Sequence, residues 1–216
     1  MAYDHEEQEQ LASIKAWWNQ YGSLLTWLLI IAMAIYAGWS GWNYYQRKQS
    51  VQSSLLYEEL EKSIVARDNL KILRTATDLQ TKFGSTPYAQ MSAFAAAKSA
   101  FDANDIAIAR AQLSWIIDHG SAEEYKAIAK LRLSGLLLDI KSYDGALNLL
   151  ETKFPTQFSG LVADRKGDIL VSQNKNDLAR ASYEFALEKT EKNSSIRQLI
   201  QMKLDALGDM PVKAAS

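Results

Sequence analysis

The apolar residues of the chain follow two different patterns, and the first is a continuous run. Residues 24–42 (LLTWLLIIAMAIYAGWSGW) are almost entirely apolar, and no charged residue lies between Lys15 and Arg47. A helix rises 1.5 Å per residue, so about 20 apolar residues cross the roughly 30 Å hydrocarbon core of a bilayer. Aromatic residues, which favour the headgroup level, flank both ends of the run: Trp17, Trp18, Tyr21, Trp42, Tyr44 and Tyr45. The pattern predicts a membrane-spanning helix over residues 23–43.

A buried core helix and a cleavable signal peptide are the alternatives for this run. The triplet Ala32-Met33-Ala34 resembles the small-x-small motif of a cleavage site. However, the preceding segment is acidic, whereas a signal peptide begins with basic residues. Apolar sequence also continues for two turns beyond the triplet. These features favour an uncleaved anchor.

Small residues form one stripe of the predicted span. Ala34, Gly38 and Gly41 recur at i, i+4 and i+7, a spacing that lets the backbone of another helix approach closely. The stripe is therefore a candidate contact with a membrane partner. The alternative is that small residues are simply common in transmembrane helices.

The segment before the span has helical periodicity. Leu11, Ile14, Trp18 and Tyr21 would lie on one face of a short amphipathic helix that ends near Gly22. We expect this helix to lie along the membrane interface, within an N-terminal tail of residues 1–22.

The second pattern is a helical periodicity that recurs from residue 51 to residue 207. Gly84 and the pair Thr86-Pro87 end one helix and begin the next. Ser121 and Glu124 have the spacing of a capping box. Further candidate N-caps are Asn104, Ser142 and Asn176. Helices are predicted at 51–66, 69–83, 87–101, 105–118, 122–140, 143–153, 160–173, 177–190 and 194–207, which makes the chain all-α.

Part of this helical region repeats. Ser134, Ala146 and Leu150 return 33 residues later as Gly167, Ala179 and Tyr183, close to the 34-residue tetratricopeptide period. The second copy also matches the small and aromatic positions of that repeat, through Gly167, Leu170, Ala179, Tyr183 and Ala186. Helix pairs of this kind stack into a solenoid that binds ligands in a groove. We therefore predict a tetratricopeptide (TPR)-like solenoid over residues 44–216, with protein binding as its function.

The helix at 122–140 supplies a candidate groove. Ile128, Leu131, Gly135 and Leu138 are expected on its inner face and would suit an exposed hydrophobic segment. The alternative is that they are ordinary core residues. Asp164 and Asp168 stand where a clamp for acidic C-terminal tails would need Lys or Asn, so a carboxylate clamp is not expected. The alternative to a role in a groove is that these two aspartates lie on a solvated helix face.

Composition argues against chemistry and against nucleic acid. The chain has no Cys, and its only imidazoles are His5 and His119, neither of which belongs to a cluster. No phosphate-binding loop, nucleophile elbow or zinc-binding motif is present. After residue 46 there remain 23 basic and 21 acidic residues, too balanced for a phosphate-binding face. We therefore expect no enzymatic activity, cofactor, metal, small-molecule substrate or nucleic acid.

Several segments together resemble a known family. They are the acidic start, LASIKAWWNQYG, the lone span ending in GWSGWNYYQ, the segment LVADRKGDILVSQNKNDLARASYEFAL and the tail QMKLDAL. In this order they resemble the YfgM-type ancillary subunit of the bacterial SecYEG translocon. The resemblance is most specific in Val162 to Leu170, in Gln201 to Leu204 and in the WWNQYG motif.

The resemblance implies a single-pass type II protein of the bacterial inner membrane. Its N-terminus would be cytoplasmic and its repeat domain periplasmic. Its partners would be SecYEG, a PpiD-type periplasmic chaperone, the lipid bilayer, and unfolded or nascent secretory polypeptides that it passes to chaperones. The positive-inside rule taken alone favours the opposite orientation, because Arg47 and Lys48 follow the span and only Lys15 precedes it. The alternative function is a membrane-anchored TPR scaffold or adaptor that organises an envelope or cytoplasmic complex.

Overall fold

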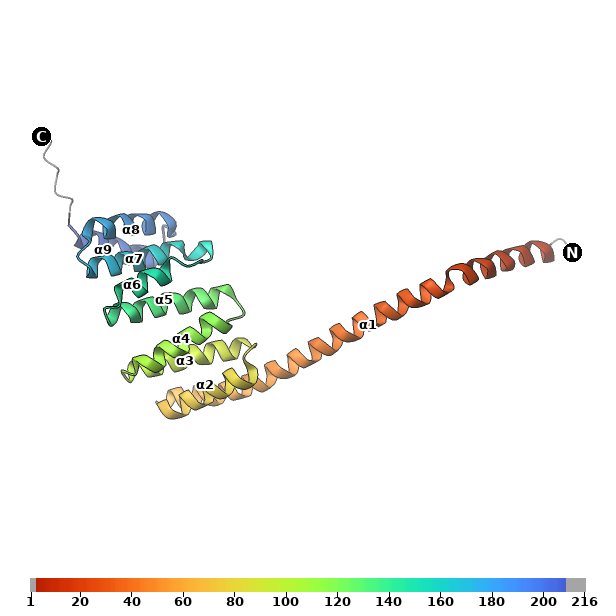
Figure 1. The fold of residues 1–216 in the computed structure, drawn as a ribbon, viewed down its shortest axis with the longest axis horizontal. Coiled ribbons are helices and arrows are strands. Elements are labelled where there is room, and N and C mark those ends of the chain that lie inside the picture. Colours follow the sequence, from red (N-terminus) through yellow and green to blue (C-terminus); the bar gives the residue numbers. More distant parts are fainter. Residues whose placement is uncertain (1–2, 209–216) are drawn as a thin grey trace, which may run out of the picture. The chain divides into compact units, whose positions relative to one another are not determined.

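The computed structural model describes the backbone of residues 3–208 and the side chains of residues 9–208. The described part excludes residues 1–2 of the predicted N-terminal tail, residues 209–216 of the predicted repeat domain and the side chain of His5. Within residues 3–208 all regular secondary structure is helical, so the all-α prediction is confirmed (Figure 1). The helices are α1 (Tyr3–Val65), α2 (Asn69–Phe83), α3 (Pro87–Asp102), α4 (Ile106–His119), α5 (Glu123–Asp139), α6 (Tyr143–Leu150), the 3-10 helix η1 (Thr156–Phe158), α7 (Ser159–Ser172), α8 (Asn176–Lys189) and α9 (Ser195–Ala206).

α1 is longer than the sequence pattern indicated. The prediction of a short helix ending near Gly22, and of a separate helix beginning at residue 51, was wrong, because one helix runs from Tyr3 to Val65. The indole of Trp18 lies over Gly22, and the Thr26 hydroxyl donates to the Gly22 carbonyl oxygen at 2.7 Å. The first proline is Pro87, so nothing in this segment forces a break.

The chain divides into two compact units, Met1–Val51 and Gln52–Ser216. In the first unit the apolar side chains of α1 point outward, and only 6% of its most apolar 18-residue window is buried. Among the described residues, α1 is the helix long and apolar enough to cross a membrane. A core helix would have covered these side chains, so the structure argues against that alternative.

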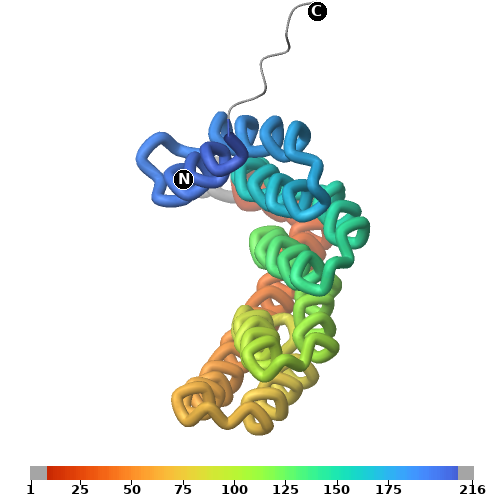
Figure 2. Tube along the Cα trace, turned by 90° about the vertical axis from the view of Figure 1, so that its left-hand side faces the viewer, coloured from red at the N-terminus to blue at the C-terminus, as the bar shows by residue number. Residues whose placement is uncertain are grey.

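The second unit is a stack of helix pairs that follows a curved path (Figure 2). Four turns between paired helices contain a residue with left-handed backbone, at φ angles of 55° to 60°: Arg67, Asn104, Lys141 and Asn174. These residues recur at intervals of 37, 37 and 33 positions. In each turn the next amide donates to a carbonyl five residues back, which is the Schellman helix end. The pairs are therefore the end of α1 with α2, α3 with α4, α5 with α6, and α7 with α8.

Buried residues repeat in the same register. The first helices of the four pairs carry Leu60, Ala97, Ser134 and Gly167 at equivalent positions, and all four are buried. The second helices carry Ile72, Ala109, Ala146 and Ala179, which are also buried. The predominance of small residues lets the paired helices approach closely. The comparison at 33 residues detected only the last of these intervals, because the two earlier intervals are 37 residues.

The observed N-caps confirm one predicted helix boundary and correct others. Thr86 is the N-cap of α3 and is followed by Pro87, as predicted. The capping box at Ser121 was wrong: Ala122 is the N-cap of α5, and the Ser121 hydroxyl accepts a 2.7 Å hydrogen bond from the buried Gln90 amide. Two further predicted caps also move by one residue, since Asp105 caps α4 and Lys175 precedes α8.

Replacement of Thr86 with alanine should destabilise the protein by about 1 kcal/mol. The Thr86 hydroxyl accepts from the Ala89 amide at 3.4 Å and donates to the Phe83 carbonyl oxygen at 2.8 Å, so it joins the ends of two helices. Ser142→Ala is the matched control, because Ser142 is an N-cap without a side-chain cap bond. Thermal unfolding followed by circular dichroism measures both; equal losses for the two variants would contradict the assignment.

Candidate functional site

The four residues of the predicted strip lie on α5 and are all half-buried. Leu131 and Leu138 pack against the main hydrophobic core, in agreement with the core alternative. Gly135 instead lines an open hollow, together with other residues of α5 and with residues of α3, α4 and α7. The strip and the hollow therefore share a single residue, Gly135.

This hollow, here named the α3–α7 groove, has a volume of about 400 Å³. Its apolar floor includes Phe101, Leu113 and Leu136, and charged side chains surround the floor. The lining residues are Ala97, Lys98, Phe101, Asp102, Ala109, Leu113, Arg132, Gly135, Leu136, Asp139 and Arg165. Phe101 is 45% exposed although it is a large aromatic residue, so it is available for contact.

Charged residues of the groove follow the repeat. Arg132 and Arg165 occupy equivalent positions in α5 and α7, 33 residues apart. The Arg132 guanidinium lies 4.7 Å from the centre of the Phe94 ring, and Nη1 of Arg165 lies 3.6 Å from a carboxylate oxygen of Asp168. A Cβ atom at Gly135 would lie 3.4 Å from Arg165 Nη1, an ordinary contact distance, so that guanidinium lies directly over α5 at this glycine.

These groups suit non-covalent binding. Guanidinium groups donate several hydrogen bonds in a fixed plane and accept none, which matches main-chain carbonyl oxygens and carboxylates. Across the described residues no group of three or more His, Cys, Asp or Glu side chains could hold a metal ion. His119 stacks on Trp115 at 5.1 Å and its Nδ1 lies 3.1 Å from the Trp115 carbonyl oxygen, a local packing role.

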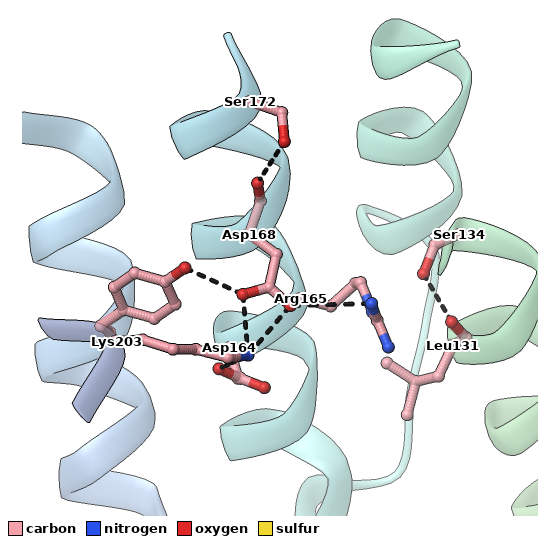
Figure 3. A network of polar contacts seen from close by, with 8 residues as sticks. Leu131, Ser134, Asp164, Arg165, Asp168, Ser172 and Lys203 are labelled. Carbon is pink, nitrogen blue, oxygen red and sulfur yellow. Dashed lines mark hydrogen bonds and ion pairs between the residues drawn. The ribbon is translucent and has the colours of Figure 1, made fainter. Parts of the chain in front are cut away.

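A cluster of charges joins the last helices of the solenoid (Figure 3). Lys203 on α9 places its ammonium group 2.8 Å from Asp164 Oδ1 and 2.7 Å from Asp168 Oδ1. The Tyr183 hydroxyl donates to Asp168 Oδ1 at 2.8 Å. Burial raises the pKa of Asp164 although the hydrogen bond from Lys203 opposes the rise. Burial and the bond to Asp168 raise the pKa of Tyr183 well above its ordinary range.

The cluster corrects the expectation of a solvated acidic face. Asp164 and Asp168 keep only 15% and 19% of their side-chain surface exposed, because α9 covers them. Sequence reasoning missed Lys203, although a signal was present. The two aspartates lie in the Val162 to Leu170 segment and Lys203 in the Gln201 to Leu204 segment, so oppositely charged residues of these two signature segments meet in the fold.

Repeat-signature residues lie beside this cluster. Ala179, Tyr183 and Ala186 are buried on α8, and Leu170 is half-buried on α7. A Cβ atom at Gly167 would overlap the Tyr183 ring, at 2.6 Å from Cδ1 and 2.7 Å from Cζ. Only a glycine lets this ring lie flat against α7.

The small-residue stripe of the span lies on the exposed surface of α1. Ala34, Gly38 and Gly41 are exposed, and a Cβ atom at either glycine would meet nothing within 4 Å. A contact of this stripe with another membrane helix stays a prediction.

Comparison with known proteins agrees with the architecture. A family model described as a tetratricopeptide repeat-like domain matches residues 15–209. A protein of Neisseria gonorrhoeae named ancillary SecYEG translocon subunit is 33% identical over 211 residues, which cover 96% of this chain and all of the relative. Proteins of the same name from Haemophilus influenzae and Escherichia coli are 28% and 26% identical, over 96% and 93% of this chain and 100% and 96% of their own lengths. The chain therefore belongs to the family of ancillary SecYEG translocon subunits, and it carries a tetratricopeptide repeat-like domain.

Proposed function

We propose that this chain is a non-enzymatic subunit of the Sec translocon in a bacterial inner membrane. Its N-terminus is cytoplasmic and its repeat domain periplasmic, where it binds newly translocated polypeptides and passes them to a PpiD-type chaperone. The names of the relatives support the association with SecYEG. The observation that carries the proposal is the exposed apolar helix α1, whose C-terminal end is the first helix of the TPR-like solenoid.

The α3–α7 groove fits an unfolded polypeptide better than a folded ligand. Its volume of about 400 Å³ accommodates a few side chains, and its apolar floor binds them without a demand for one sequence. Arg132 and Arg165, repeated at one register, can donate to main-chain carbonyl oxygens that every polypeptide has. Extended chains expose both features before they fold.

One crosslinking experiment tests client binding and orientation together. A photoreactive phenylalanine analogue in place of Phe101 should crosslink in cells to an exported polypeptide arrested during translocation. The same analogue at Leu70, which is 83% exposed and lies outside the groove, is the control. Because a polypeptide that lacks its export signal stays in the cytoplasm, it should give no adduct.

Three other outcomes of this experiment would each contradict one part of the proposal. An adduct with the signal-less polypeptide would overturn the periplasmic orientation and favour the cytoplasmic adaptor, in agreement with Arg47 and Lys48 after the span. Equal adducts at Phe101 and Leu70 would show that the groove is not the binding site. Absence of SecYEG from the complex purified after crosslinking would overturn the translocon association.

A further inference from the structure

A second hollow lies beside the end of α6, and the repeat register explains its presence. α6 has 8 residues, whereas α2, α4 and α8, the equivalent helices of the other pairs, have 15, 14 and 14. Ile116 of α4 and Ala186 of α8 occupy equivalent positions in their pairs, and both are fully buried. The equivalent residue in the α5–α6 pair is Lys153, which lies beyond the end of α6. The segment of α7 that a longer α6 would cover is therefore left open.

This hollow, here named the α6–α8 groove, has a volume of about 650 Å³ and is lined mainly by apolar side chains. Val162 and Leu170 of α7 belong to its lining, and Phe154 and Pro155 follow the end of α6. On α8, Leu178 is 58% and Phe185 is 46% exposed, so two large apolar residues of this groove face outward. Exposed apolar residues gathered around one hollow mark a contact surface.

The charge of the groove has one sign. Lys166 is the only charged residue of its lining, and it is half-buried. Of the ion pairs in the described part of the chain none includes Lys166. Two further lysines lie over aromatic rings of the lining: Lys130 Nζ is 5.2 Å from the centre of Phe154, and Lys189 Nζ is 5.2 Å from the centre of Phe185. Lys189 is also paired with Glu188 at 2.6 Å, so Lys166 is the lysine on which the charge argument rests. An ammonium group among apolar side chains, with no acidic partner, favours a ligand that brings a carboxylate.

We propose that the α6–α8 groove binds an amphipathic helix of a second protein, which packs apolar side chains against Phe185, Leu178 and Val162 and presents a carboxylate to Lys166. The space fits a helix, because it takes the place of about two missing helical turns. Apolar residues at i, i+4 and i+7 of the partner would face the groove, as in other helix-in-groove complexes. This site goes beyond client binding and is separate from the α3–α7 groove.

A helical peptide tests the proposal with the full chain in lipid nanodiscs. The probe is a fluorescent, side-chain-stapled peptide of about 14 residues, with Leu at i, i+4 and i+7 and one Glu on the same face. Fluorescence anisotropy should show saturable binding to the unchanged protein. Phe185→Asp should weaken this binding at least about tenfold, because it places a charge in the apolar contact. Leu70→Asp, an equally drastic change outside the groove, should leave it unchanged.

A charge exchange provides the sharper measurement. Lys166→Glu should weaken binding of the Glu peptide about tenfold and favour a peptide with Lys at that position, whereas Lys166→Gln should lower the preference between the two peptides. Thermal unfolding of each variant checks that the fold is kept.

Absent or non-saturable binding, or the same affinity for both peptides whatever residue stands at 166, would overturn the proposal. So would light scattering that shows a dimer which Phe185→Asp dissociates, since a second copy would then be the occupant. The crosslink at Phe101 does not involve this groove, so either proposal can fail while the other stands.

Discussion

Replacement of Gly167 with alanine should destabilise the solenoid by about 2 kcal/mol, which corresponds to a fall of roughly 4–8 °C in the thermal midpoint. The added methyl group would lie 2.6 Å from Cδ1 and 2.7 Å from Cζ of Tyr183. The ring is 2% exposed and its hydroxyl is bonded to Asp168, so it has no free space into which to move. Alanine gains about 1 kcal/mol of helix propensity, which offsets only part of the overlap.

A second glycine of the same solenoid provides the control. Gly135→Ala places its methyl group 3.4 Å from the end of the Arg165 side chain, which is flexible, so this variant should be neutral or up to about 1 kcal/mol more stable. Circular dichroism of the full chain in detergent measures both variants. The double variant Gly167→Ala with Tyr183→Leu should recover part of the loss. The same midpoint for Gly167→Ala and Gly135→Ala would contradict the close approach.

Local sequence signals predicted most of the fold. The eight helices predicted from residue 69 onward all form, with ends within three residues of the prediction. Proline, N-cap and periodicity signals act within a few residues, so they can be interpreted one segment at a time. Gly22 lies inside α1 instead of ending it, and the Trp18 indole packs over it.

Features that depend on distant residues could not be predicted in the same way. The turns that mark the 37-residue intervals contain residues of different kinds, such as Arg67 and Lys141, so the turns carry no repeated residue type that would reveal the interval in sequence. Ser121 had a local capping partner in sequence, but the buried Gln90 amide bonds to its hydroxyl from 31 residues away. The α3–α7 groove has lining residues from four helices, and its shape depends on their packing.

The charge cluster shows how such a distant contact can acquire a signature. Asp164 and Asp168 are one helical turn apart on α7, and Lys203 reaches both from α9, 39 and 35 residues away in sequence. Each segment alone has a charge pattern of an exposed helix face. Their distinctive residues are explained only when the two segments meet, because a buried carboxylate needs a partner.

Lys203→Met should destabilise the protein by about 2–4 kcal/mol near pH 7, at least as much as the glycine variant. The substitution keeps the length of the side chain but leaves two largely buried carboxylates without a counter-charge. This loss of stability is somewhat smaller than the roughly 3–5 kcal/mol lost when a fully buried ion pair is broken, because Lys203 itself keeps 25% of its side-chain surface exposed. Lys82→Met is the matched control: Lys82 pairs with Asp78 at 3.2 Å on the surface, and its loss should cost less than about 0.5 kcal/mol.

The pH dependence of this variant separates electrostatics from packing. The folded-state pKa of Asp164 lies above its ordinary value of 3.8, so the folded protein binds this proton more readily than the unfolded chain, and the associated stability is lost as pH rises through the folded pKa. Met at 203 removes the hydrogen bond that holds this pKa down, so the pKa rises further and the pH window widens. The deficit of Lys203→Met should therefore shrink as the pH falls from about 7.5 toward the ordinary pKa of an aspartate. Adding Asp164→Asn and Asp168→Asn should recover most of the loss at pH 7. If the deficit were the same at every pH and persisted in the triple variant, Lys203 would act through the packing of its carbon chain, and the ion pairs would not be what holds α9 against α7.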